Sequence, residues 1–433
     1  MLYKTLLNTT LLLGVTLNLF AQDVYTVDEL IIKSLQNSPN IKISKLNYDA
    51  STKKYDISYS NYLPKVDLNA GLDKISQSDI PANSNNMKDD ELLFGSLSLK
   101  QILYDFGKTG GDVQTSLYNS KSYSMKNKQD ISDKKRDVKV AYYQVLKAMA
   151  LIDVQKENVK LNKAQLYRSK RYFEAGIRTK IDVSDAKVTL IQAKIDLKNA
   201  QYNLKLAYSN LDKIVGFETP EREYVIYNQK LQLDSLYSSI KDYDLNLREA
   251  VLYAYEHKYE LKQQKYTISA SKEQITQAEG KYYPSLYLLA DYTKQHTQKF
   301  NAVLPEDAWK IGVNLNWNLY EGGASDANTQ EKKIEADIAN AQLHDTYLKI
   351  KKETTNAYIN VEKSKDALEL SQSLVEVSDE KFDQAKKRYE HGLSDYIELQ
   401  EARQGYIDAK ATLVIDYYDY HIATAYLDNA IGR

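Results

Sequence analysis

Cysteine is absent from this chain of 433 residues. Its absence excludes disulfides, thiolate nucleophiles, cysteine-based zinc sites and a lipidated N-terminal cysteine. Glycine and proline are also scarce, at 15 and 6 residues, where average usage would give roughly 30 and 20. Because these two residues interrupt helices, their scarcity predicts long uninterrupted helices.

Strong net charge and long apolar runs are lacking as well. The net charge is −1, so no basic field indicates a nucleic-acid partner. No segment beyond the N-terminus has the run of about 18 apolar residues that a transmembrane helix needs. An exported chain without such a helix can still enter the outer membrane as a β-barrel. Tyrosine is abundant, with 37 residues, and it suits surfaces that are partly wet and partly apolar.

The N-terminus has the layout of a secretory signal. Lys4 supplies a positive charge, residues 6–20 are largely apolar, and Leu19-Phe20-Ala21 reads as a cleavage site. We predict a signal peptide at residues 1–21. The alternative is a membrane anchor, but the apolar stretch is shorter than the roughly 20 residues that a spanning helix requires.

The rest of the chain repeats itself. Segments 104–107 and 173–177 resemble segments 320–323 and 389–393, each at an offset of 216 residues. Repeats of about 200 residues are too long for a solenoid unit and indicate a duplicated domain. We predict a first structural repeat at 22–228 and a second at 229–433, which together build one pseudo-symmetric body.

Each repeat contains one very long stretch without glycine or proline, followed by a glycine turn. Within it, apolar and small residues recur at alternating steps of four and three, which is a heptad pattern. The pattern predicts long helices at about 108–175 and 324–391, each with two shorter helices stacked end to end beside it. The narrow apolar stripe favours a hollow cylinder that is wet inside and outside over a solid bundle.

Short alternating segments precede each long helix. They predict strands at about 65–77, 92–104, 285–298 and 308–320. Each is roughly the length of a tilted membrane strand, although a soluble, half-buried hairpin is the alternative. A small barrel already needs about eight strands, and an open sheet edge cannot face lipid. We therefore predict that three chains pool their strands.

This pattern resembles the TolC-like outer-membrane efflux proteins, also called outer membrane factors. The resemblance rests on the duplication, on the strand exits Tyr104–Gly107 and Tyr320–Gly323, and on the turn Arg388–Leu399. It covers essentially the whole mature chain. It implies a mainly α fold with a small β-barrel contribution. Long antiparallel coiled-coil helices would form an α-barrel, and four transmembrane β-strands per chain would build a 12-stranded barrel in a homotrimer.

The resemblance also implies a function. Such a chain lies in outer-membrane lipid with a periplasm-spanning helical domain, and it needs no cofactor and no metal. It conducts substrates passively from an inner-membrane pump and a periplasmic adaptor to the exterior, in tripartite efflux or type I secretion. We expect no enzyme, because the sequence shows no nucleophile–base arrangement and no dinucleotide fingerprint. The alternative is a non-conducting periplasmic coiled-coil scaffold or adhesin stalk, which would need no water-facing lumen.

Matching positions to the family places the candidate gate beside the two glycine turns. The resemblance implies an acidic constriction formed by Asp182 and Asp185 in the first copy and by Glu398 and Glu401 in the second. Glutamate departs from the aspartate usual in the family. Tyr389 matches a gating tyrosine that would pair with Asp182 on a neighbouring hairpin. The alternative is that these carboxylates lie near a helix start only because negative charge there interacts favourably with the helix dipole.

The remaining candidates lie in the turns themselves. Arg178 occupies the place of a gating arginine in the first copy, whereas the second copy has Ser394 there. Any salt-bridge lock must therefore be arranged differently from the family pattern. Gly176 and Gly392 mark the turns at which we expect the adaptor to dock.

Overall fold

The computed structural model describes residues 23–76, 89–218, 224–228, 231, 233–297 and 306–433. The predicted signal peptide lies outside the described residues. The elements of the first half are β1 (Asp23–Tyr25), α1 (Val27–Asn37), α2 (Pro39–Tyr59), β2 (Lys65–Ser76), β3 (Asp89–Tyr104), α3 (Lys108–Glu174), α4 (Lys180–Val215) and β4 (Tyr224–Ile226). Those of the second half are α5 (Leu236–Ser239), α6 (Leu247–His257), α7 (Tyr259–Glu279), β5 (Ser285–Thr297), β6 (Asp307–Asn316), α8 (Ala324–Glu390) and α9 (Tyr396–Ile431).

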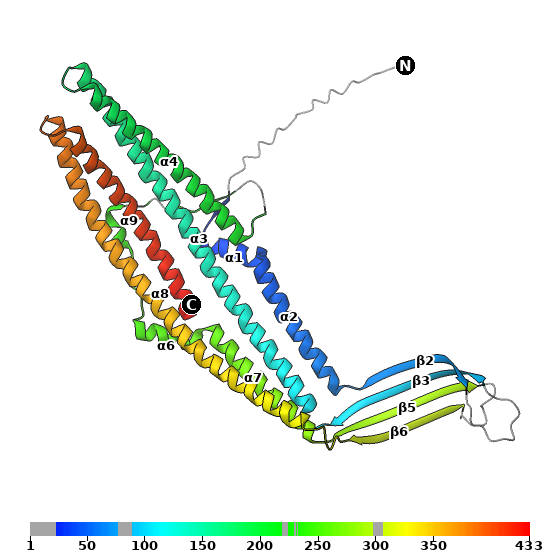
Figure 1. Cartoon of the computed structure of the whole chain (residues 1–433). Helices are drawn as coiled ribbons and strands as arrows, with labels where there is room; N and C mark the ends of the chain where they lie inside the picture. Colours follow the sequence, from blue (N-terminus) through cyan, green and yellow to red (C-terminus); the bar gives the residue numbers. More distant parts are fainter. Residues whose placement is uncertain (1–22, 77–88, 219–223, 229–230, 232, 298–305) are drawn as a thin grey trace, which may run out of the picture.

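The helices form a long shaft with a four-stranded sheet at one end and two helical turns at the other (Figure 1). The helices α3 and α8 each contain 67 residues, or roughly 100 Å at 1.5 Å per residue. The shorter helices α2 and α4 pack along α3, while α7 and α9 pack between α3 and α8. The wall therefore runs from α2 and α4 through α3 and the α7–α9 pair to α8.

The shorter helices of each repeat meet end to end. A Cβ atom placed on Gly216, at the end of α4, would lie 3.2 Å from the carbonyl oxygen of Asn37, at the end of α1. The equivalent Gly432 at the end of α9 approaches His257 and Lys258 as closely. Both glycines have a positive φ, which L side chains adopt only with strain. The predicted end-to-end stacking is thus confirmed.

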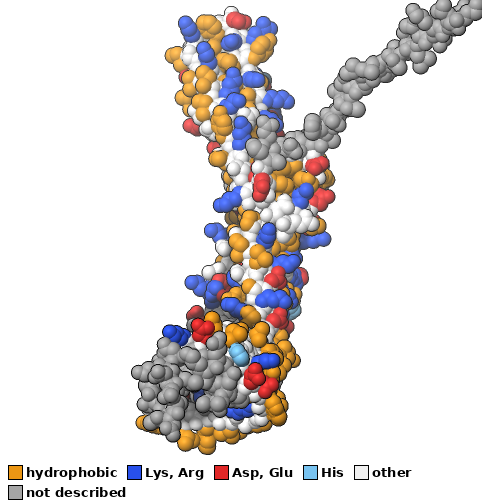
Figure 2. Space-filling model, turned by 90° about the vertical axis from the view of Figure 1, so that its right-hand side faces the viewer, with side chains coloured by type: hydrophobic (Ala, Val, Ile, Leu, Met, Phe, Trp, Pro, Cys, Tyr) orange, Lys and Arg blue, Asp and Glu red, His pale blue; other side chains and the backbone are white. Residues whose placement is uncertain are grey.

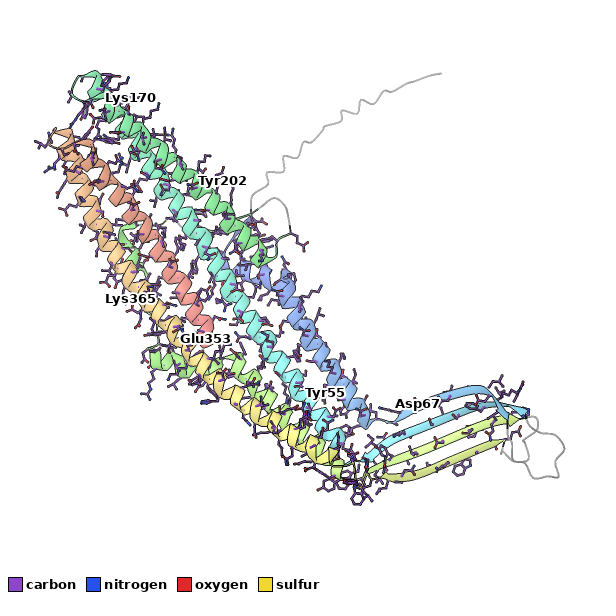
Figure 3. All side chains as sticks on the ribbon, in the orientation of Figure 1. Tyr55, Asp67, Lys170, Tyr202, Glu353 and Lys365 are labelled. Atoms are coloured by element: carbon purple, nitrogen blue, oxygen red, sulfur yellow. The ribbon has the colours of Figure 1, made fainter. Side chains whose placement is uncertain are left out.

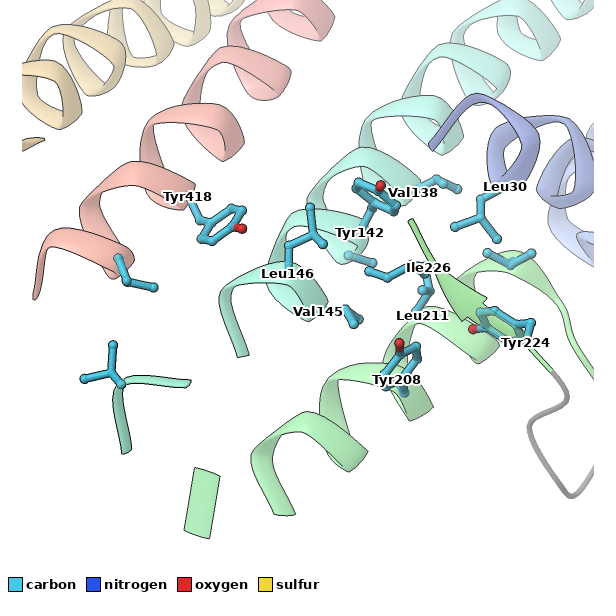
Figure 4. Close-up of a cluster of buried hydrophobic side chains, with 14 of the residues drawn as sticks. Leu30, Val138, Tyr142, Val145, Leu146, Tyr208, Leu211, Tyr224, Ile226 and Tyr418 are labelled. Carbon is cyan, nitrogen blue, oxygen red and sulfur yellow. The ribbon is translucent and has the colours of Figure 1, made fainter. Parts of the chain in front are cut away.

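A layer of short elements surrounds these joints. We call it the belt, and it consists of β1, α1, β4, α5 and α6. The main apolar core lies beneath it, where Val138, Tyr142 and Val145 of α3 pack with Leu30 of α1 and Leu211 of α4 (Figure 4). The hydroxyl of Tyr142 donates to the carbonyl of Tyr227, just after β4, at 2.7 Å. The belt thus fixes one face of α3.

The sheet has the order β2-β3-β5-β6, and all its neighbours are antiparallel. Its register aligns side chains into rows across all four strands. One row is Val66, Leu99, Ala290 and Ile311, and the next row on the same face is Leu68, Leu97, Tyr292 and Trp309. The row between them faces the other way and contains Asp67, Ser98, Asp291 and Lys310. One face of the sheet is therefore apolar and the other is polar.

The last strand is shorter than expected, because β6 ends at Asn316 and not near residue 320. Asn316 pairs with Ser285, the first residue of β5. Pro284 precedes it and has no N–H to continue the ladder. Beyond the strand, the indole N–H of Trp317 donates to the carbonyl of Tyr282 at 3.0 Å. Strand β3, in contrast, begins at Asp89, a little earlier than predicted.

None of the helices in the described part of the chain combines the length and the apolar character needed to cross a lipid bilayer.

Candidate functional site

The two turns lie side by side at the end of the shaft that is far from the sheet (Figure 1). Each long helix ends in a glycine with positive φ, Gly176 at +70° and Gly392 at +73°. The N–H of Ile177 bonds the carbonyl of Tyr172 at 2.9 Å, and Leu393 bonds Arg388 in the same way. These are Schellman-type ends, which explains why each turn needs a glycine. The turn places the start of α4 or α9 directly beside the helix it leaves.

Asp182 serves first as a helix cap. Its carboxylate accepts the backbone N–H of Thr179 at 3.0 Å, while the Thr179 hydroxyl accepts the N–H of Asp182 at 3.4 Å. This reciprocal pair is a capping box, which satisfies two orphan donors at the start of α4. Asp185, one turn further, is exposed. The capping interpretation therefore accounts for Asp182 within a single chain but not for Asp185.

Tyr389 is the most buried candidate, with only 1% of its surface exposed. Its ring lies 6.3 Å from the rings of both Tyr172 and Tyr396. Its hydroxyl is buried and makes no hydrogen bond with Asp182. Burial raises the pKa of the phenol, whereas the Ser169 side chain and the Arg178 charge act in the opposite direction. Within one chain, Tyr389 thus does not pair with Asp182.

Arg178 connects the two turns. Its guanidinium lies 4.8 Å from the centre of the Tyr389 ring, and its Nη2 donates to the carbonyl of Ser394 at 3.0 Å. A cation over a ring face is attracted by the ring quadrupole. The side chain of the first turn therefore binds both the ring and the backbone of the second.

The glutamates of the second copy are positioned differently from each other. Glu398 forms an ion pair with Arg388 at 3.0 Å, and its N–H is capped by Asp395 at 2.9 Å. Glu401 is exposed and continues the same helix face. The structure thus brings Arg178 and Tyr389 together, while Asp185 and Glu401 make no ion pair among the described residues.

Two contacts at this end were not predicted from the sequence. Arg168 of α3 forms an ion pair with Glu390 of α8 at 2.6 Å, and the hydroxyls of Thr189 and Tyr396 lie 2.9 Å apart. Both join the first hairpin to the second. The residues are more than 200 positions apart in sequence, so local patterns carry no signal for either contact.

The opposite end of the molecule defines a second surface. The apolar face of the sheet is exposed, with Leu68 and Trp309 each 77% accessible in the single chain, and hydrophobic side chains gather at this end of the molecule (Figure 2). Aromatic residues, including Tyr104 and Tyr320, lie where the strands join the helices. The described residues contain no group of three or more His, Asp or Glu side chains that is arranged to hold a metal ion.

The fold is shared with solved outer-membrane proteins. The structure of VceC from Vibrio cholerae superimposes with a TM-score of 0.80 at 16% identity, over 94% of this chain and 96% of that one. In sequence, the TolC protein of Vibrio cholerae is 22% identical over 93% of this chain and 90% of its own length. The toluene efflux pump outer membrane protein TtgC of Pseudomonas putida is 20% identical over 94% of this chain and 82% of its own length.

An amphipathic four-stranded sheet joined to a long helical shaft is therefore an architecture that this chain shares with solved outer-membrane proteins. A family model described as outer membrane efflux protein matches residues 30–217 and 253–433. The chain belongs to the outer membrane efflux protein family.

Proposed function

We propose that this chain is one third of a homotrimeric duct, the outer-membrane channel of a tripartite efflux or type I secretion system. It conducts substrates passively from an inner-membrane pump and a periplasmic adaptor to the exterior. The observation that carries the proposal is the sheet. It has an apolar face, a polar face and, in the described chain, two edge strands, β2 and β6, without partners. Such edges cannot face lipid, so further copies must complete the sheet.

The two tryptophans of the chain support a position in the bilayer. Trp309 lies near the start of β6 and Trp317 just beyond its end. Eight residues of extended chain span about 26 Å, which becomes about 20 Å along the membrane normal at a tilt of about 40°. Aromatic girdles flank an apolar band of about 25 Å in membrane barrels. The apolar row that contains Ile311 lies between these two levels, and the neighbouring row contains Trp309 itself.

The edges of the helical wall support assembly with further copies. On α4, exposed apolar side chains recur every seven residues on the side facing away from α3. They are Ile181, Val188, Ile195 and Tyr202, the last of which is labelled in Figure 3. On α8, Leu370, Leu374 and Val377 are likewise exposed, opposite the face that packs on α9. Heptad-spaced apolar stripes on both edges are what a closed ring of copies would bury.

The tip is proposed as the gate. In a threefold assembly, Asp182, Asp185, Glu398 and Glu401 would surround one axis, where like charges concentrate cations. Arg178 and Tyr389 would hold the two hairpins of each chain together in the closed state. The turns at Gly176 and Gly392 are the proposed docking points of the adaptor, because both are exposed at the extreme end of the shaft.

Single-channel recording in planar bilayers tests this function. The wild-type trimer should conduct, and divalent cations added on the tip side should block it. The double variant Glu398→Gln/Glu401→Gln, at the start of α9, should weaken that block. The control Glu376→Gln/Glu380→Gln removes the same charge from α8, farther from the turn, and should not weaken it. Unchanged block in the first variant would remove the carboxylates from the gate. No conductance in any variant would favour the scaffold or stalk.

A further inference from the structure

The two long hairpins of the chain have opposite net charge. Residues 108–215, which form α3 and α4, contain 22 Lys and Arg against 11 Asp and Glu. Residues 324–431, which form α8 and α9, contain 13 against 21. The first hairpin is therefore strongly basic and the second acidic, although the whole chain is nearly neutral.

Part of the basic excess lies on one face of α3. Lys156, Lys160, Lys163 and Lys170 recur at steps of four, three and seven, and all are exposed. We call these four, with the adjacent Arg171, the basic stripe. It extends over about 22 Å of helix and ends close to the turn, where Figure 3 labels Lys170. Residues spaced in this way share one side of a helix.

The basic stripe lies on the belt side of the wall. Lys160 follows Leu146 by two heptads, and Lys156 follows Tyr142 in the same way. Both Tyr142 and Leu146 face the belt. The helix α3 is flanked by α4 on one side and by α9 on the other. Between the belt and the turn, the belt-side face of α3 is therefore covered neither by a described element of the chain nor by the edges proposed to join copies.

The lysines of the stripe are largely unneutralised. Lys156 pairs with Asp153 at 2.9 Å, but Lys160, Lys163 and Lys170 form no ion pair in the described part of the chain. Tyr167 lies among them and is 66% exposed, which adds an apolar surface. A row of unpaired cations beside an exposed aromatic ring attracts a surface of opposite charge and offers it an apolar contact.

The equivalent face of α8 carries the opposite charge in its middle part, whereas Lys386 and Lys387 near the turn keep the basic charge of Lys170 and Arg171. Lys160 and Lys163 correspond to Glu376 and Asp379 in the second repeat, and both acidic residues are exposed. Glu376 follows Glu369 by seven residues, and Glu369 accepts a hydrogen bond from a belt tyrosine at 3.1 Å. This face therefore also lies on the belt side. The two hairpins therefore differ in charge at the positions of Lys160 and Lys163 and agree near the turn.

The structure already shows α3 binding acidic helices. On its flank, Lys139 pairs with Asp428 at 3.7 Å and Lys147 with Asp419 at 2.8 Å, both on α9. Nearer the turn, Arg168 pairs with a carboxylate of α8. Cations of α3 thus pair with acidic residues of two neighbouring helices, the antiparallel α9 and the parallel α8. The basic stripe offers the same chemistry on a face where its lysines are exposed among the described residues.

We propose that the basic stripe is a docking surface for an acidic α-helix of a periplasmic partner protein, and that Glu376 and Asp379 of α8 repel the same helix at the equivalent position of the second hairpin. The proposal rests on the proposed function only in placing the shaft in the periplasm as an assembled ring. It explains why two hairpins of equal length and fold differ in charge. An acidic partner helix would thus bind the basic stripe on α3 in preference to the equivalent position on α8, and it would dock in one register. Opposite charges across such a contact determine specificity and association rate.

Binding of synthetic helices to the intact trimer tests the proposal. The probes are a fluorescent heptad peptide with glutamate along one face, its lysine counterpart, and disordered poly-glutamate of equal charge. At low salt the acidic helix should bind the wild type. Lys160→Glu/Lys163→Glu should weaken it roughly tenfold or more and should bind the lysine helix instead. The matched control is Lys128→Glu/Lys135→Glu, on the same face of α3 but on the sheet side of the belt, and it should bind like the wild type.

Several results would overturn the proposal. Equal weakening in the control would reduce the effect to net charge. Poly-glutamate binding as tightly as the acidic helix would make the stripe a general polyanion surface. No binding to the wild type would remove the surface altogether. Gel filtration and circular dichroism verify that each variant is folded and trimeric. Conductance of the same samples separates the two proposals, because a silent channel that still binds the acidic helix contradicts only the proposed function.

Discussion

Replacing Arg178 with alanine should favour the open tip. The change removes the guanidinium that lies 4.8 Å from the Tyr389 ring and its hydrogen bond to Ser394 at 3.0 Å. A half-buried cation–π contact contributes about 1 kcal/mol. A charge-assisted hydrogen bond adds about 1 kcal/mol after a discount for its partial exposure. The closed arrangement thus loses about 2 kcal/mol per chain, or about thirtyfold in the equilibrium between closed and open.

The assay is single-channel recording of purified trimers in planar bilayers, with open-state occupancy as the readout. Arg178→Ala should raise occupancy strongly, and Arg178→Lys should lie between it and the wild type, because lysine keeps the charge but not the planar stacking. The control is Arg171→Ala, which removes the same charge seven residues earlier from an exposed side chain that stacks only on Tyr167. If Arg178→Ala and Arg171→Ala behave alike, the inter-hairpin contact does not hold the tip closed.

Three further outcomes are expected. Gly111→Ala should lower the melting temperature, because its Cβ would lie 2.7 Å from backbone atoms of α7 and overpacking costs about 1–3 kcal/mol. Gly405→Ala, whose Cβ would meet nothing within 4 Å, should raise stability by up to about 1 kcal/mol. A Gly111→Ala variant more stable than Gly405→Ala would contradict the helix packing. Burial lowers the pKa of His421, which lies among the rings of Tyr143, Tyr417 and Tyr420. The unfolded chain therefore binds more protons than the folded one just below pH 6.5, and stability is lost as the pH falls through that range. His421→Gln should flatten the fall in melting temperature between pH 7 and 5, and an unchanged slope would refute the assignment. Val188→Glu/Ile195→Glu on α4 should leave the chain helical but monomeric in detergent, whereas Leu252→Glu, exposed on the belt, should stay trimeric; intact trimers of the first variant would exclude this edge from the assembly.

The long helices could be predicted from the sequence because residues next to each helix end determine where it ends. Both α3 and α8 end within one residue of the position that a turn glycine marked. Glycine alone adopts the positive φ of such turns cheaply, so the signal needs no knowledge of distant residues. The prediction for the end of β6 was wrong because that end depends on Pro284. This proline precedes β5, so the alternating pattern of β6 itself gives no sign of it.

The candidate site was less predictable for the same reason. The positions of Tyr389 and Arg178 beside the turns follow from the duplication, but their stacking depends on how two hairpins lie against each other. That lateral placement results from many contacts along α3 and α9, none of which is local. Asp182 shows a different limit, since one carboxylate near a helix start fits both a cap and a constriction. Only the geometry shows that the cap is made.

The unpaired edges of the sheet have a genetic consequence in the proposed trimer. A single chain that enters the bilayer would expose two rows of unsatisfied backbone groups, so insertion and assembly must be completed as one event. Every chain then meets both neighbours through different edges, and one defective edge leaves the ring open. In a cell that makes normal and edge-defective chains together, the yield of sound rings falls as the cube of the normal fraction. A missense change on β2 or β6 should therefore be dominant, whereas loss of the whole gene copy should be recessive.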